Sequence, residues 1–471
     1  MESCTCMKLI MKFGGTSVQN AESVRRAVDI VYERYSRQDR LAVVVSARRG
    51  VTDRLIACAE SMVTSRDADE VADLVTFLTE GHLTTLKEVA PDFYPETSEI
   101  IIRRIENLRD FLYAVYHLRE LTVRSRDYIT SFGERLNAPL ISAAFRQRGI
   151  PSMVLDGCEA GILTTENHGD AIALPAGEAR IRSRLEPVIE HSVPVITGFM
   201  GCTEKGVVTT LGRSGSDYSA TIVGAALDAD EIWIWTDVDG IMTTDPRMVP
   251  EARVIPRISY IEVMELSYFG AKVMHSRSIE PAMQKGIPVL VKNANNPGYP
   301  GTVIDGGEKK DSRVVKAITY IDKVAAVTIT GAQMVGRPGV ARHIFSLLAE
   351  HQINVMMISQ GSSEANITLV IEANQVALAM EALSPLKERC VFRDITANED
   401  VSAVAVVGSG MAGMAGTAGR TFSALGKAGI NVMMITQGSS EVNISFIVRQ
   451  QDGPRAVKVL HDEFNLMNEE G

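Results

Sequence analysis

The sequence predicts an α/β protein in which a mostly parallel sheet, covered by helices on both faces, precedes two small ferredoxin-like units. Two observations carry this prediction. Through the first 300 residues, short apolar runs alternate with amphipathic stretches, as buried parallel strands and their covering helices do. Later the chain repeats itself, because NVMMISQGSSEANI at 354–367 returns as NVMMITQGSSEVNI at 431–444 with two differences.

The elements of the first region follow from apolar spacing. Short apolar runs predict strands at 41–47, 194–199, 231–237 and 288–293. From Ala21 the apolar residues recur at steps of three and four, which predicts a helix. Ser259 followed by Glu262 predicts a capped helix start. A stripe that begins at Ile129 predicts one helix that Pro139 kinks.

Domain boundaries follow from a change in composition. Residues 293–311 are rich in Gly, Pro, Asn and charged residues, and the periodicity lapses there. We therefore expect a catalytic domain over 1–300, a linker over 301–323, and repeat units over 324–400 and 401–471. The repeats take up the residues after the breakpoint, so we expect no further catalytic domain.

Each repeat is expected to open with a strand, at 324–331 and at 401–408. A glycine loop, a helix, a strand, a turn, a strand and a helix follow, which fits the ferredoxin-like βαββα(β) motif. A unit this small buries little surface alone, so we expect the copies to pack together or against another subunit.

Composition excludes several classes of function. The 471 residues are 45% hydrophobic and 23% charged, with a net charge of −10, which argues against a general nucleic-acid binder. The sequence lacks both a signal peptide and an apolar run long enough for a membrane span, so we expect a cytoplasmic protein. Six sparse cysteines without zinc spacing indicate reduced thiols.

The stretch MKFGGTSV at 11–18 follows a strand where a helix is expected to begin. Gly14 and Gly15 allow a close backbone approach, and amides at a helix start together with Lys12 favour an anion. The Walker pattern is absent. This turn therefore either binds phosphate or simply connects the strand to the helix.

Two further stretches carry polar groups at strand ends. In TTLGRSGSDYSA, Arg213 offers a planar fork that suits a carboxylate, and Asp217 suits either a binding site or a simple N-cap. In WTDVDGIMTTDPR, Asp237, Asp239 and Asp245 follow a buried strand without calcium-loop spacing. By contrast, GSGMAG at 408–413 lacks the downstream acid of a dinucleotide site.

Six stretches in order, MKFGGTSV, VVVSA, SFGERL, TTLGRSGSDYSA, WTDVDGIMTTDPR and FGAKVMH, make the chain resemble the aspartate kinases of the amino-acid kinase family. The repeats resemble the paired ACT domains of such kinases, so the resemblance covers nearly the whole chain. It implies transfer of phosphate from ATP, with Mg²⁺, to the side-chain carboxylate of L-aspartate. The product is 4-phospho-L-aspartate, the entry to lysine, threonine, methionine and isoleucine.

The resemblance also implies roles at the phosphoryl group. Lys12, with the amides of Gly14 and Gly15, would neutralise its charge. Asp217 would orient lysines and Mg²⁺ rather than act as a base, because the accepting carboxylate is already ionised at neutral pH. The metal is expected to arrive with ATP, so no set of protein ligands is expected. The positions matching the family's nucleotide contacts are Thr236, Asp237, Arg247 and Lys272.

Aspartate itself would be held at two points. Arg213 would bind its α-carboxylate and Glu134 its ammonium group, with Ser46, Thr52 and Ser216 lining the pocket. The alternative for Glu134, as for Lys272, is a solvated surface charge.

Regulation is expected in the repeats, where an end-product amino acid, threonine or lysine with threonine slightly preferred, would bind and favour an inactive arrangement of a homo-oligomer. The alternative is that the repeated residues form only an interface between copies. The candidate effector residues are Gly336, Pro338, Gly339, Gln360, Asn431 and Val432.

Five positions depart from the family pattern. Ser214 stands where glycine is usual, Met242 replaces a common tyrosine, and Ser276 replaces a proline. Arg48 and Arg49 add charge near the expected pocket, where they are either solvated or meet a substrate carboxylate.

Two other functions fit the sequence less well. A kinase acting on glutamate is disfavoured by the expected two-point clamp and by the tail. An idle amino-acid sensor is disfavoured by the intact Lys12 and Asp217.

Overall fold

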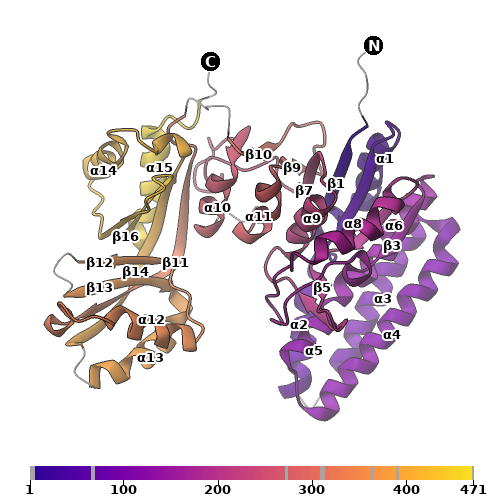
Figure 1. Ribbon diagram of the computed structural model, residues 1–471, viewed down its shortest axis with the longest axis horizontal. Helices are drawn as coiled ribbons and strands as arrows, with labels where there is room; N and C mark the ends of the chain where they lie inside the picture. The colour runs from indigo at the N-terminus through magenta and orange to yellow at the C-terminus, as the bar shows by residue number, and fades with distance from the viewer. Residues whose placement is uncertain are drawn as a thin grey trace. The chain divides into compact units, whose positions relative to one another are not determined.

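The computed structural model describes residues 6–64, 69–270, 274–307, 313–361, 365–388 and 392–468 (Figure 1). Contacts between residues divide the chain into two compact units. The first comprises Met1–Ile241, Pro256–Tyr260 and Val273–Gly307, and the second comprises Met242–Ile255, Ile261–Lys272 and Glu308–Gly471. Two segments ahead of residue 300 therefore belong structurally with the repeats.

An eight-stranded sheet forms the centre of the first unit, in the order β3-β4-β2-β1-β7-β9-β10-β8. Neighbouring strands are parallel except β9 and β10. The predicted strands are present as β2, β4, β7 and β9, and a hairpin of β5 and β6 lies outside this sheet. The bounds are β1 Lys8–Phe13, β2 Arg40–Val45, β3 Ser152–Leu155, β4 Val193–Thr197, β5 Met200–Cys202, β6 Val208–Thr210, β7 Glu231–Thr236, β8 Arg257–Ser259, β9 Val289–Asn293 and β10 Thr302–Asp305.

Alternate residues of β1 face opposite sides of the sheet. Leu9 and Phe13 join the apolar core formed with helices α1 to α6, whereas Ile10 lies against Gly224 of α9. Lys12 shares the face of Ile10, and this places it towards α9. The helix bounds are α1 Ala21–Tyr35, α2 Val51–Thr64, α3 Asp69–Val89, α4 Tyr94–Leu118, α5 Val123–Thr130, α6 Phe132–Gln147, α7 Gly157–Ala160, α8 Gly177–Ile189, α9 Gly215–Ala226 and α11 Ser276–Lys285.

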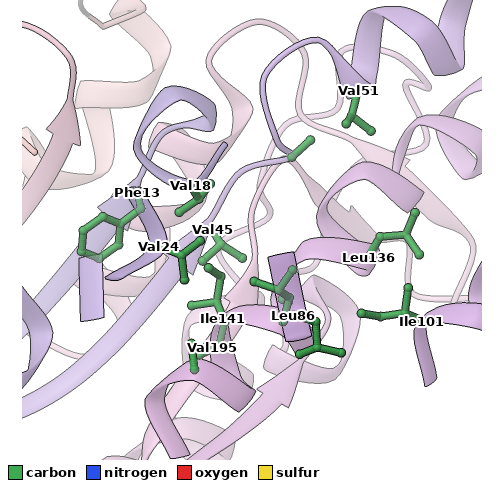
Figure 2. Close-up of a cluster of buried hydrophobic side chains, with 14 of the residues drawn as sticks. Phe13, Val18, Val24, Val45, Val51, Leu86, Ile101, Leu136, Ile141 and Val195 are labelled. Carbon is green, nitrogen blue, oxygen red and sulfur yellow. The ribbon is translucent and has the colours of Figure 1, made fainter. Parts of the chain in front are cut away.

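The core under α1 to α6 gathers side chains that are far apart in the sequence. Figure 2 shows Phe13 and Val45 from the sheet near Val24, Leu86 and Ile141 from three helices. All five side chains are almost entirely excluded from solvent. Burial of each such side chain stabilises the fold by roughly 1.5–3 kcal/mol relative to exposure.

The predicted apolar stripe lies in helix α6 from Phe132 onward, whereas Ile129 belongs to the preceding helix. Helix α5 ends at Thr130 and α6 begins at Phe132. The Thr130 hydroxyl donates to Arg126 O at 2.9 Å, and the Ser131 hydroxyl donates to the carbonyl of the residue three before it. Such side-chain bonds compete with the helical pattern. Pro139 lies inside α6.

The second unit contains a six-stranded antiparallel sheet in the order β12-β13-β11-β14-β16-β15. Each repeat has the predicted βαββα order, which confirms the duplication as a structural one. The strand bounds are β11 Ala317–Thr330, β12 Met357–Gln360, β13 Asn366–Glu372, β14 Asp394–Val407, β15 Met434–Gln437 and β16 Asn443–Arg449, and the helices are α12 Val340–Glu350, α13 Val376–Glu388, α14 Thr417–Lys427 and α15 Gly453–Glu463.

The second repeat takes one strand from the chain ahead of the first repeat. Residues 394–398, at the start of β14, pair with 326–330 of β11 and so close the sheet of the first repeat. Residues 317–321, at the start of β11, pair with 403–407 of β14 and close the sheet of the second repeat. Side chains follow the same division, because Ile395 lies in the first repeat's core and Ile318 in the second's. Each repeat thereby obtains the fourth strand of a ferredoxin-like sheet.

The expected linker over 301–323 contains ordered strands. Residues 302–305 form β10 in the first sheet, and β11 begins at Ala317, seven residues earlier than the strand expected at 324–331. Thr302 and Ile304 are fully buried. The domain boundaries themselves stay a prediction.

Two segments that precede the repeats in the chain are bound to them. Thr243 accepts the N–H of Ile318 at 2.8 Å through its carbonyl oxygen. Helix α10, Tyr260–Tyr268, places the carboxylate of Glu262 2.6 Å from the N–H of Ser409 and 3.3 Å from Lys316 Nζ. Glu262 is fully buried, so this side chain serves as an anchor in the second unit.

Candidate active site

An ion pair between β1 and α9 lies at the centre of the candidate site. Lys12 Nζ is 2.6 Å from Asp217 Oδ1, and each side chain is about nine-tenths buried. Asp217 lies in the first turn of α9, where the helix dipole favours a carboxylate. Ser214 occupies the N-cap position, so the simple N-cap alternative for Asp217 is wrong.

The glycine turn after β1 is tightly packed. A β-carbon on Gly15 would lie 2.7 Å from the carbonyl oxygen of Ala47, so only glycine fits without a shift of backbone. Gly14 donates its N–H to Trp235 O at 3.1 Å. One of the two amides that the sequence assigns to an anion is therefore committed to the contact between β1 and β7.

The helix that opens at this turn is short. Residues Gly15–Val18 form a 3₁₀ helix, η1, and the amphipathic helix α1 begins only at Ala21. Asn20 caps α1 by accepting the N–H of Ser23 at 2.9 Å. The anion-binding amides expected here therefore belong to η1 rather than to α1.

Glu134 is a buried carboxylate on α6, 3% exposed. Its Oε1 accepts the N–H of Ala47 at 3.0 Å, while Oε2 has no hydrogen-bond partner among the described residues. Burial raises the pKa of Glu134 to about 8, although the Ala47 N–H and the charge of Lys12 oppose this rise. A buried carboxylate with one unpaired oxygen is costly, so the site favours a cation there. The solvated-charge alternative is wrong.

The segment between β2 and α2 borders Glu134. Ser46 and Thr52 are both partly buried there. Ser46 O accepts Nδ2 of Asn137 at 2.8 Å, and Oδ1 of the fully buried Asn137 has no partner in the described part of the chain. Asn137 was not among the residues predicted for the site. Its position one helical turn after Glu134 was the available signal.

The start of α9 is strained and closely packed. Ser214 has φ 54° and ψ 28°, a left-handed conformation that costs a non-glycine residue roughly 1–2 kcal/mol. This explains why glycine suits the position. A β-carbon on Gly198 would lie 2.7 Å from Cβ of Ser216, so β4 and α9 meet through these two residues.

Arg213 is exposed on the loop that leads into α9, and no hydrogen bond or ion pair with another described side chain is recorded for it. Burial, Arg277 and Arg213 together lower the pKa of His275, so the Arg213 guanidinium lies near that imidazole. Arg213 is four residues from Asp217 in sequence. The structure thus brings Lys12, Asp217 and Glu134 together, whereas Arg213 is exposed on the loop before α9.

A buried carboxylate that was not predicted anchors the loop that carries Arg213. Asp127 on α5 is 2% exposed and accepts the Thr210 hydroxyl at 2.5 Å and the Gly169 N–H at 3.0 Å. Its second oxygen lies 2.7 Å from Nδ1 of His168. Because Thr210 ends β6 just before Arg213, Asp127 fixes the base of that loop.

The nucleotide candidates are dispersed. Thr236 ends β7 with its hydroxyl 3.3 Å from Oδ1 of the exposed Asp237. Arg247 belongs to the second unit and pairs with Asp245, with Nη2 to Oδ2 at 2.6 Å. Lys272 lies outside the described residues.

The other four departures from the family pattern lie in different surroundings. Ser276 is the first residue of α11, the position where proline fits a helix best, and serine is tolerated there. Met242 forms an antiparallel bridge with Val254 in the second unit. Arg49 is exposed, whereas the Arg48 guanidinium binds backbone carbonyl groups.

The effector candidates lie on exposed parts of the repeats. Gly336 and Gly339 have φ 66° and 92°, so the loop before α12 needs glycine at both. The edge strands of the two repeats approach each other, with the Thr436 hydroxyl 3.5 Å from Ile358 O. Of the candidates, five are exposed and one is partly buried: Gly336, Pro338, Gly339, Gln360, Asn431 and, partly buried, Val432.

The described residues contain neither a cluster of potential metal ligands nor a membrane-spanning helix. No group of three or more His, Cys, Asp or Glu side chains there is placed to hold a metal ion. None of the helices in the described ranges has the length and apolar character that crossing a membrane requires.

Comparisons with known proteins agree with this architecture. The profile of the amino acid kinase family matches residues 7–293, and that of the ACT domain matches 327–385 and 404–464. Aspartokinase 1 of Arabidopsis thaliana is 33% identical over 97% of this chain and 80% of its own length. The bifunctional aspartokinase/homoserine dehydrogenase of Haemophilus influenzae is 34% identical over 96% of this chain, which spans 56% of that relative.

Solved structures show the same arrangement of elements. Escherichia coli aspartokinase III in complex with aspartate and ADP (R-state) is 28% identical, with a TM-score of 0.83 over 97% of this chain and 99% of that one. The same enzyme in complex with lysine and aspartate (T-state) is 29% identical, with a TM-score of 0.80 over 98% of this chain and 100% of that one.

Proposed function

The chain belongs to the amino acid kinase family, among its aspartokinases, and from this premise we propose that it transfers the γ-phosphoryl group of Mg·ATP to the side-chain carboxylate of L-aspartate. The product is 4-phospho-L-aspartate, at the entry to lysine, threonine, methionine and isoleucine synthesis.

One observation carries the proposal most directly. The unpaired Oε2 of Glu134 lies in a buried site whose other charges are the Lys12–Asp217 pair. The ammonium group of an amino acid would supply the partner that Glu134 lacks, and a side-chain carboxylate would be drawn towards Lys12. Arg213, exposed and free of recorded partners, would bind the α-carboxylate. Ser46, Thr52 and Ser216 would line the pocket.

The chemistry requires two anions to meet. The aspartate carboxylate is ionised at neutral pH and needs no base, so catalysis consists of positioning and charge neutralisation. Lys12, oriented by Asp217, would neutralise charge on the transferring phosphoryl group. The η1 amides would donate hydrogen bonds to phosphate oxygens, whose close approach Gly14 and Gly15 permit.

Mg²⁺ would enter with ATP and neutralise part of its phosphate charge. Thr236 and Asp237, at the carboxyl end of β7, would contact the nucleotide, as would Arg247 and Lys272. The ADP named with the E. coli structure supports nucleotide use.

The repeats would bind an end-product amino acid. The lysine in the E. coli T-state complex supports lysine as one candidate, and threonine is the other. The exposed apolar residues Ile358 and Ile435 on the edge strands support a homo-oligomer formed through the repeats. Bound effector would then favour the less active arrangement by its differential affinity.

The test is a coupled ADP-release assay with Mg·ATP and, separately, L-aspartate, L-glutamate and L-homoserine, each with and without lysine or threonine. Of the three acceptors, we expect turnover only with aspartate, and we expect inhibition by one of the two effectors. Turnover with glutamate and none with aspartate would reassign the substrate, and no turnover with any acceptor would refute the kinase function.

A further inference from the structure

Arg48 binds main-chain carbonyl groups of two distant segments. Its Nε donates to Gln19 O at 3.0 Å, its Nη2 donates to the same oxygen at 2.5 Å, and its Nη1 donates to Gly81 O. The guanidinium is therefore neither freely solvated nor available to a substrate carboxylate, the two alternatives that the sequence left open.

Both acceptors are suited to a cation. Gln19 is the C-cap of η1, where a helix leaves carbonyl groups unpaired and carries partial negative charge. Gly81 lies inside α3, where glycine costs about 1 kcal/mol relative to alanine. A β-carbon there would lie 3.4 Å from Nη1 of Arg48. Glycine at this position thus gives the guanidinium room to approach the carbonyl.

The loop that carries Arg48 contacts both halves of the candidate site. Arg49 donates its N–H to Gly15 O at 3.3 Å, and the Ala47 carbonyl lies directly against Gly15. On its other side, the Ala47 N–H is the donor that holds Glu134. A shift of this loop would therefore displace the glycine turn and Glu134 relative to each other.

We infer that Arg48 is a positioning residue, which fixes the separation between the glycine turn at Gly14 and Gly15 and the ammonium-binding carboxylate of Glu134. The inference rests on the proposed function, because that separation matters only if one substrate bridges the two. A misplacement of about 1 Å in such a site can lower the rate by roughly a hundredfold.

The surroundings of Arg48 make the role specific to arginine. Its planar fork reaches two carbonyl oxygens at once, whereas a lysine ammonium is a single point charge. The side chain also borders a surface hollow of about 600 Å³ that includes Glu22, Glu80 and Glu88. These carboxylates favour a cation, and the hollow gives a small guanidinium compound access from solvent.

The experiment compares Arg48→Ala, Arg48→Lys and Arg48→Met with Arg49→Ala, the matched control on the exposed neighbour. For wild type and each variant, kcat and KM for aspartate and for ATP are measured, together with hydrogen exchange of the amides at 13–20 and 46–50. We expect Arg48→Met to lower kcat/KM for aspartate by roughly ten- to a hundredfold and to speed exchange in both segments. Arg48→Lys should recover only part of this loss, and Arg49→Ala should match wild type.

Chemical rescue separates positioning from general stability. Methylguanidinium at millimolar concentration should restore part of the activity of Arg48→Ala and slow the exchange at 13–20, with no effect on Arg49→Ala. Normal kcat/KM in Arg48→Met, or exchange unchanged in both segments, would overturn the inference. If wild-type protein shows no turnover with aspartate, the proposed function fails, while the exchange measurement still decides whether Arg48 fixes the two segments.

Discussion

The hydroxyl of Thr243 lies 3.0 Å from Nε2 of His461, and both side chains are fully buried in the second unit. Thr243 belongs to the segment between β7 and β8, whereas His461 is on α15, the last helix. The same segment carries Arg247, so this proposed nucleotide contact belongs to the second unit.

Thr243→Val is expected to destabilise the second unit. The substitution leaves Nε2 of the buried His461 without a partner, which costs about 1–3 kcal/mol. Hydrogen exchange of the α15 amides, or the midpoint of urea unfolding, measures the loss. Thr243→Ser keeps the hydroxyl and serves as the control. A valine variant as stable as the serine variant would show that this bond contributes nothing.

Lys12→Met is expected to lower kcat by roughly 10²–10³, the usual effect of removing one preorganised charge from the reacting group. It also leaves Asp217 as an unpaired buried carboxylate, so the melting temperature should fall. Lys12→Met combined with Asp217→Asn should regain stability without regaining activity. Near-normal turnover in the single variant would mean that Lys12 does not contact the phosphoryl group.

Glu134 should release a proton when aspartate binds. With its pKa near 8 it is mostly protonated at pH 7, and pairing with an ammonium group requires the ionised form. Calorimetry in buffers of different ionisation enthalpy should show release of close to one proton at pH 7 and little at pH 9. Glu134→Gln should bind aspartate weakly and release none. Heats independent of the buffer at pH 7 would contradict this role.

The same pKa affects stability with a definite sign. The pKa of Glu134 is raised from about 4.5 in the unfolded chain to about 8, so the folded state binds more protons between these values. This contribution is complete below pH 4.5 and is lost as the pH rises through 8. Without aspartate, Glu134→Gln should therefore flatten the loss of stability between pH 6 and 8.

His82 should make the protein acid-sensitive. Burial, together with the charge of Arg48, lowers the pKa of His82 to about 4, and its Nε2 has no partner among the described residues. Stability is unaffected above pH 6.5 and falls as the pH decreases towards 4, by about 2 kcal/mol at pH 5. Melting temperatures at pH 7.5 and pH 5 measure the slope. His82→Gln should reduce it, and the exposed His117→Gln should leave it unchanged.

Ser214→Gly is expected to relieve strain. The left-handed conformation costs serine roughly 1–2 kcal/mol, offset in part by the greater chain entropy of glycine. We expect a stability gain of about 1 kcal/mol at most, read as a higher melting temperature. Ser214→Ala retains the unfavourable φ and is the control. A lower melting temperature for the glycine variant than for the alanine variant would show that the conformation is not strained.

Features that depend on local pattern were predictable from the sequence. The strands β2, β4, β7 and β9 are continuous apolar runs because both faces of the sheet are covered. The duplication was evident from the segment at 354–367 that recurs at 431–444. Lys12 and Asp217 lie together because α9, with Asp217 in its first turn, packs on the face of β1 that carries Lys12.

Features that depend on long-range partners were not predictable. The burial of Glu134, the Asp127 network and the carbonyl partners of Arg48 all arise from segments tens of residues away. The first half of β11 escaped notice because TYIDK mixes apolar and polar residues, and its pairing with β14 is a tertiary contact. The two hydroxyl bonds that end α5 give no periodic signal.

The second repeat encloses the first along the chain, and this imposes an order on synthesis and inheritance. As the chain leaves the ribosome, residues 317–321 emerge before the first repeat but cannot pair until residues 403–407 have followed it. A gene fragment that ends between the repeats would leave residues 317–321 without a partner strand. Recombination that replaces residues 401–471 alone would pair new strands with an old one, so the second repeat must be inherited together with the segment that precedes the first.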